Sequence, residues 1–224
     1  MKNFAPHRPS FYFYFNVFIL ILVFGGFGLN ALVHSDKLPP ASGVVYIHGL
    51  IMFLWYFLIV GQSGMIRSGN ISLHKKLGKS SLLLAFGIVI SGIWMSLVHY
   101  SRPDGFIFST INTFILINFI ILYFLAWTNR HRPEFHKRYM IFVSLSAVFP
   151  ALGRIILGLN FNQYLSVPLW IVLVLVMGMY DYRSQKKIHP ATKIGTGLIL
   201  VGIALTLILM ENAAWKAFLD GLMG

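Results

Sequence analysis

Long apolar stretches alternate with short polar segments along the whole chain, a pattern typical of a polytopic membrane protein. A helix that spans a membrane needs about 20 consecutive, mostly apolar residues. The stretches that satisfy this requirement are residues 11–33, 44–66, 78–99, 106–128, 138–158, 163–182 and 192–211. The first stretch is too long for the apolar part of a signal peptide and no small-residue cleavage site follows it, so we expect it to be retained. The sequence therefore predicts an all-α bundle of seven transmembrane helices that forms a single domain over residues 1–224.

The composition excludes several classes of protein. Of the 224 residues, 57% are hydrophobic and 11% are charged, whereas a soluble domain carries about a quarter charged residues. The mean hydropathy of +0.75 agrees with a membrane protein. Because the chain has no cysteine, disulfides, thiolate metal sites, iron–sulfur clusters and cysteine nucleophiles are excluded.

The basic residues predict the orientation of the bundle. If the predicted helices alternate in direction, fourteen of the 18 Lys and Arg residues lie on the side of the N-terminus. Cytoplasmic loops collect Lys and Arg, so we expect an N-in, C-out topology. These residues are Lys2, Arg8, Arg67, Lys75, Lys76, Lys79, Arg130, Arg132, Lys137, Arg138, Arg183, Lys186, Lys187 and Lys193.

The same bias explains the net charge of +12. No basic stretch is interleaved with stacking aromatic residues, so we expect no nucleic acid partner. The expected partners are the lipid bilayer and, at the basic loops, anionic lipids. The style of the sequence is typical of the bacterial inner (cytoplasmic) membrane, which is the expected localisation.

Polar side chains near the predicted outer face are candidates for a cofactor site. His34, His48 and His99 lie there, and histidine is the commonest metal ligand and also binds haem iron. His48 lies about one turn inside its predicted helix, where a polar side chain needs a partner, and the adjacent Gly49 leaves room for a large group. His34 and His99 are equally explained as interfacial residues.

Arg154 is a charged residue that lies more than a few residues from either end of its predicted span. Such residues face the bundle interior and mark functional sites, although Arg154 is equally explained by extension to the interface or by pairing with Glu211. The first hypothesis is therefore that His48, with His99 or His34, binds haem b or a transition metal. Arg154 then neutralises a haem propionate or another anion.

Three further histidines lie near the predicted inner face, just before helix starts. If their helices are neighbours, His74, His136 and His189 converge, and three imidazoles bind zinc, copper or iron. Alternatively they are ordinary loop residues among lysines and arginines, or they contact quinone. No lysine lies deep in the last helix, which argues against a retinal protein. No carboxylate lies at mid-span, which argues against proton-coupled transport.

Two short segments carry a resemblance to known bacterial membrane families. The first is His48, Gly49, Leu50, Ile51, Met52, Phe53, Leu54 and Trp55, followed by Gln62 and by residues 73–78, and the second is His136, Lys137, Arg138, Tyr139 and Met140. The first segment is similar to cytochrome b561-like proteins, and the second to small multi-helix proteins that help to build haem–copper oxidases. The resemblance implies haem, a redox role and a respiratory membrane protein as partner. Di-haem cytochromes of this kind place paired histidines inside facing helices, whereas here only His48 is clearly inside a span, so if haem binds we expect one haem or an unusual site.

Three functional interpretations stay open at this point. One is a redox or metal-linked membrane protein with a site at His48. Another is a non-catalytic assembly factor, subunit or lipid-binding scaffold, whose histidines are interfacial. The last is an uncoupled channel or carrier for a small solute. The sequence assigns no catalytic residue.

Overall fold

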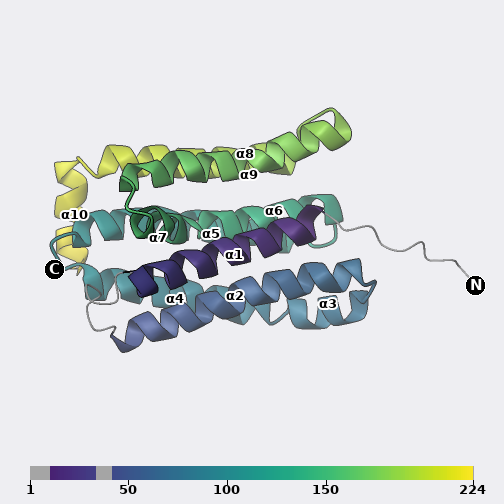
Figure 1. The fold of residues 1–224 in the computed structure, drawn as a ribbon, viewed down its shortest axis with the longest axis horizontal. Coiled ribbons are helices and arrows are strands. Elements are labelled where there is room, and N and C mark those ends of the chain that lie inside the picture. The colour runs from purple at the N-terminus through teal and green to yellow at the C-terminus, as the bar shows by residue number, and fades with distance from the viewer. Residues whose placement is uncertain (1–10, 34–41, 224) are drawn as a thin grey trace, which may run out of the picture.

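The computed structural model describes residues 11–33 and 42–223, and its regular structure within them is entirely helical, with no strand (Figure 1). This agrees with the expected all-α fold. The helices are α1 (Phe11–Val33), α2 (Gly43–Arg67), α3 (Ile71–Gly78), α4 (Ser81–His99), α5 (Gly105–Thr128), α6 (Pro133–Ser146), α7 (Phe149–Gly158), a 3-10 turn η1 (Gln163–Leu165), α8 (Ser166–Gln185), α9 (Pro190–Leu209) and α10 (Ala213–Met223).

Six helical segments of the described chain are long and apolar enough to cross a membrane. They are α1, α2, α3 with α4, α5, η1 with α8, and α9. The pair α6 and α7 passes the same test together but is bent by 45°, so the number rises to seven if this pair crosses as one span. Large apolar side chains are exposed around the outside of these helices, as expected for surfaces that face lipid.

The expected continuous helix over residues 138–158 is broken between α6 and α7. Pro150 lies in the first turn of α7, and a proline ring clashes with the carbonyl four residues earlier, here that of Ser146. α6 therefore ends at Ser146. It also begins earlier than expected, at Pro133, because proline is well tolerated in the first turn of a helix.

Two short helices lie outside the expected spans. α3 is an eight-residue helix capped by Asn70, whose side chain accepts a hydrogen bond from the Leu73 amide at 3.1 Å. α10 lies across one end of the bundle (Figure 1). The Trp215 indole of α10 donates to the Thr110 hydroxyl at 3.0 Å, and the Tyr100 hydroxyl donates to Asp220 at 2.7 Å.

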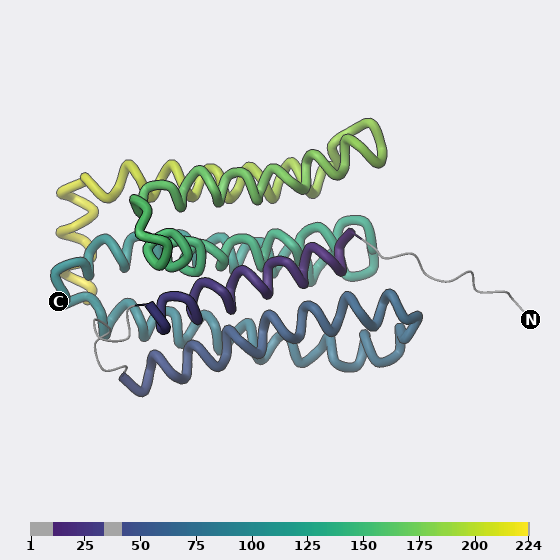
Figure 2. The backbone as a smooth tube through the Cα atoms, in the orientation of Figure 1, coloured from purple at the N-terminus to yellow at the C-terminus, as the bar shows by residue number. Residues whose placement is uncertain are grey.

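α5 and α6 lie at the centre of the bundle. α4 and α9 pack against α5, α1 runs between α2 and α7, and α8 packs against α7 and α9 (Figure 2). Every residue of α6 from 141 to 146 is buried. α6 and the break that follows it therefore contribute much of the interior surface on which polar groups meet.

One end of the bundle, here called the basic end, is where α2, α5 and α8 finish and α3, α6 and α9 begin (Figure 1). Twelve of the basic residues assigned to the cytoplasmic side lie at this end, the other two being outside the described residues. The opposite end carries α10. Which face of a membrane the basic end meets stays a prediction.

Candidate functional site

His48 is held in one tautomer by a neighbouring helix. Its Nδ1 lies 2.9 Å from the Ser91 hydroxyl oxygen of α4. The Ser91 hydroxyl also lies 2.6 Å from the Gly87 carbonyl, which can only accept, so we assign its hydrogen to that carbonyl and the Nδ1–H of His48 to the Ser91 oxygen. The neutral His48 ring therefore carries its proton on Nδ1 and has a lone pair on Nε2.

Asn112 is oriented in a similar way. Its side-chain nitrogen donates to the Gly92 carbonyl and to the Ser96 hydroxyl, each at 2.7 Å. Because a carbonyl only accepts hydrogen bonds, the nitrogen must face α4. The amide oxygen of Asn112 consequently faces away from α4.

His48 and Asn112 both line a cavity of about 40 Å³, here called the His48 cavity. A cavity needs about 10–15 Å³ to hold one water molecule, so this cavity has room for roughly three water molecules. The cavity is therefore large enough for a metal ion between its ligands, but its volume is smaller than that of a haem group. The break between α6 and α7 supplies part of the wall. The lining residues are His48, Met52, Ile88, Asn112, Ile115, Leu116, Phe119, Ala147 and Pro150.

Arg154 lies in the same half of the molecule, one turn after Pro150 on α7. One guanidinium nitrogen donates to the Pro150 carbonyl at 3.0 Å, and the guanidinium carbon lies 4.2 Å from the centre of the Phe27 ring of α1. Among the described residues Arg154 forms no ion pair, so the alternative pairing with Glu211 is not formed.

His99 lies apart from the His48 cavity. It is the last residue of α4, its Nδ1 bonds the Met95 carbonyl at 2.9 Å, and its ring lies 5.2 Å from that of Phe108. Eight residues separate it from Ser91, which is about 12 Å along the helix. His99 therefore lies away from Ser91, the residue that His48 contacts, and the two histidines do not share one site. His34, the other candidate partner, lies outside the described residues.

Two of the three inner histidines lie close together. The rings of His74 and His136 have centroids 6.5 Å apart and are nearly perpendicular. His136 donates from Nδ1 to the Ala126 carbonyl at 2.9 Å. The Gln62 amide, oriented to satisfy its neighbours, donates to Nδ1 of His74 at 2.6 Å and accepts from the Gly78 amide at 3.2 Å. His136 thus has a lone pair on Nε2, whereas His74 carries a proton there.

His189 is used elsewhere. Its Nδ1 accepts a hydrogen bond from the Ala191 amide at 3.1 Å, so it caps α9, and its ring lies edge-on to Phe135 at 4.6 Å. Across residues 11–33 and 42–223, no group of three or more His, Cys, Asp or Glu residues is placed to hold a metal ion. The convergence of three inner histidines is therefore not seen in this part of the chain.

A buried ion pair at the basic end was missed by the sequence argument. The side chains of Arg138 and Asp181 are both fully buried, and their closest atoms are 2.6 Å apart. Asp181 also accepts from the Thr192 hydroxyl at 2.5 Å and from the His189 amide at 3.1 Å. Arg138 donates further to the carbonyl and the carboxylate of Glu134. The network joins α6, α8 and α9.

Asp181 lies near the C-terminal end of α8, which runs to Gln185. It therefore does not contradict the expectation that no carboxylate lies at mid-span, but it was not singled out from the sequence. The available signal was an acidic residue on the last turn of an apolar run, among many bases. Because its oxygens already accept from Arg138, Thr192 and His189, Asp181 is a structural group.

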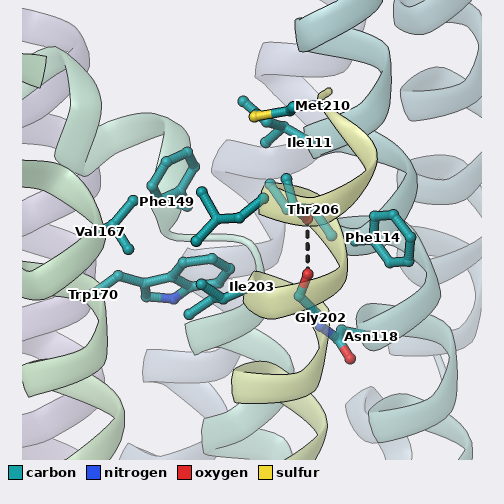
Figure 3. A pocket seen from close by; sticks show the side chains of 12 residues that line it. Ile111, Phe114, Asn118, Phe149, Val167, Trp170, Gly202, Ile203, Thr206 and Met210 are labelled. Carbon is teal, nitrogen blue, oxygen red and sulfur yellow. Dashed lines mark hydrogen bonds between the residues drawn. The ribbon is translucent and has the colours of Figure 1, made fainter. Parts of the chain in front are cut away.

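A second cavity of about 40 Å³ lies between α5, α8 and α9 (Figure 3). Its walls are mostly aromatic and aliphatic, including Phe149 and Trp170. The Thr206 hydroxyl donates to the Gly202 carbonyl at 2.8 Å, and the Trp170 indole donates to the Leu145 carbonyl at 2.7 Å. With no histidine or charged side chain in its lining, this cavity suits an apolar group, and the His48 cavity is the better candidate for chemistry.

Comparison of the chain with protein-family models, with curated proteins and with solved structures finds no match. The resemblance to cytochrome b561-like proteins therefore stays an expectation, and the candidate site rests on the geometry described above.

Proposed function

We propose that this chain is an integral protein of a bacterial inner membrane that holds a haem or transition-metal centre at His48, in a redox or oxidase-assembly role. The observation that carries the proposal is that His48, whose ring is oriented by Ser91, lines a cavity between the helices. An ionisable side chain within a membrane span is expensive and marks a functional site.

The hydrogen bond from His48 to Ser91 supports a ligand role. Histidines that bind metals almost always donate their other ring N–H to an oxygen, which fixes the ring and makes the free nitrogen a better ligand. Ser91 is itself anchored on Gly87 at 2.6 Å. The supporting partner that a metal-binding histidine needs is thus already formed.

Arg154 supplies positive charge in the same half of the bundle. It has no carboxylate partner among the described residues, so it is free to offset a haem propionate or another anionic ligand. This agrees with the role that the sequence suggested for it.

The His74–His136 pair is the candidate contact for a quinone at the basic end. The His74 Nε2–H would donate to a quinone carbonyl, and the Nε2 lone pair of His136 would accept from the hydroxyl of the reduced form. The complementary tautomers of these two rings support this assignment.

The test is a dithionite-reduced minus air-oxidised absorbance spectrum, with elemental analysis, of protein purified in mild detergent. We expect haem or a transition metal at near one equivalent, and we expect His48→Ala to lose it. His131→Ala is the matched control because His131 is exposed at the basic end. Full cofactor content in His48→Ala would contradict the proposal. Protein that carries neither haem nor metal and co-purifies with a stoichiometric partner would favour the scaffold interpretation.

A further inference from the structure

We infer that the centre at His48 is a soft monovalent ion of the copper(I) class, bound by Nε2 of His48 and the thioether sulfur of Met52. This inference rests on the proposed function, because it names the ion that the same site takes. It goes further by assigning Met52 as a ligand and by setting haem and divalent ions aside.

The placement of the two side chains is the first argument. Residues four apart on a helix lie one above the other on the same face, and His48 and Met52 both belong to α2 and both line the His48 cavity. The His48 ring is already oriented by Ser91 at 2.9 Å. One helix face therefore presents an imidazole and a thioether to the same small space.

The size of the cavity is the second argument. About 40 Å³ accommodates an ion between side chains, whereas pockets for larger organic ligands have volumes of about 300–1,000 Å³. A haem would have to push α2, α4 and α5 apart, while an ion would not.

The chemistry of the lining selects the class of ion. Thioether ligands select copper(I), and imidazole also binds copper well. The lining contains no carboxylate, and the chain has no cysteine, so no negative ligand stabilises a divalent ion. Asn112 adds a neutral amide oxygen to the lining.

The charge of Arg154 strengthens this selection. Coulomb repulsion grows in proportion to the charge of the ion, and the guanidinium lies 3.0 Å from the carbonyl of Pro150, a residue of the cavity wall. A divalent ion would therefore meet about twice the repulsion that a monovalent ion meets, with nothing in the lining to offset it.

The chain contains matched internal controls for the spacing. Met95 and His99 on α4, and His136 and Met140 on α6, are also four residues apart. Neither pair lines the His48 cavity, and His99 uses its Nδ1 on the carbonyl of Met95. A His and a Met four residues apart thus occur at three places, but of these pairs only His48 and Met52 line the His48 cavity.

The experiment is an anaerobic titration of the purified full chain with copper(I), in competition with the chromophoric chelator bathocuproine disulfonate, alongside a titration with zinc(II). We expect one copper(I) per chain and much weaker binding of zinc(II). Affinity for copper(I) should fall by at least ~10-fold in Met52→Leu and in His48→Ala. Met95→Leu should bind like the unaltered protein.

The outcomes separate the inference from the proposed function. Met52→Leu conserves volume, and its elution profile and thermal unfolding report whether it remains folded. If folded Met52→Leu binds copper(I) as tightly as the unaltered protein, the inference fails. If haem or zinc(II) is bound and lost in His48→Ala but not in Met52→Leu, the inference fails and the proposed function stands. If no haem or metal binds at His48, both fail.

Discussion

At the basic end Asp181 accepts hydrogen bonds from Arg138, Thr192 and His189. In the opposite half His48 lines a cavity, and its printed hydrogen bond uses one ring nitrogen, on Ser91. A buried charge without a partner costs several kcal/mol, so the Arg138–Asp181 ion pair has a structural role. A neutral ring with a free lone pair costs much less and can gain a ligand. The comparison teaches that the most strongly bonded buried group of this protein is not its best candidate for function.

The largest expected effect comes from breaking the Arg138–Asp181 ion pair. Replacing Asp181 with leucine leaves the buried Arg138 charge without its main partner, and removal of one member of a buried pair costs about 3–5 kcal/mol. We expect Asp181→Leu to lower the thermal unfolding temperature in detergent substantially. Glu134 limits the loss, because it still accepts two hydrogen bonds from Arg138.

The double variant Arg138→Met with Asp181→Leu is the control for this prediction. It removes both charges, so it should recover part of the stability that Asp181→Leu loses. An Asp181→Leu protein that unfolds at the temperature of the unaltered chain would contradict the structural role of the Arg138–Asp181 ion pair.

A smaller effect is expected where α1 meets α7 in the half that contains His48. A Cβ added at Gly26 would collide with the backbone carbonyl of Ala151, so α7 would have to shift. Overpacking of this kind costs about 1–3 kcal/mol. Because α7 carries Pro150 and Arg154, we expect Gly26→Ala to weaken metal or cofactor binding as well as stability.

Gly25→Ala is the matched control, because a Cβ there meets nothing within 4 Å. It should leave both stability and binding unchanged, apart from a small gain in helix propensity. Equal effects of Gly25→Ala and Gly26→Ala on thermal unfolding and metal content would show that the close approach of α1 to α7 does not position the site.

The smallest expected effect is a pH dependence at the basic end. Burial lowers the pKa of His189 below its ordinary value of 6.5, and the nearby Arg138 charge lowers it further. The folded protein therefore binds this proton less well than the unfolded chain, and stability decreases as pH falls below about 6.5 until the lowered pKa is passed. Protonation would also remove the Nδ1 acceptor for Ala191.

His189→Asn tests this pH dependence, because asparagine keeps a helix-capping oxygen and does not titrate. We expect the thermal unfolding temperature of the unaltered protein to fall more between pH 7.5 and pH 5.5 than that of the variant. Parallel curves for the two proteins would exclude His189 as the source.

Parts of the fold were readable from local sequence features. Apolar length predicted most of the long helices to within a few residues. The break between α6 and α7 was not predicted, although Pro150 was an available signal for it. α10 escaped prediction because 11 residues are too few to cross a membrane. Its position depends instead on contacts of Trp215 and Asp220 with Thr110 and Tyr100.

The sequence by itself determined the helical class, the approximate spans and the gathering of basic residues at alternate loops, because apolar length and charge are properties of local segments. It also identified His48 and Arg154 as polar residues inside spans. Only the tertiary structure decided which groups meet. Ser91 lies 43 residues from His48, and Asp181 lies 43 residues from Arg138. The tautomer of one pair and the burial of the other arise from packing between helices distant in the sequence, which local pattern does not encode.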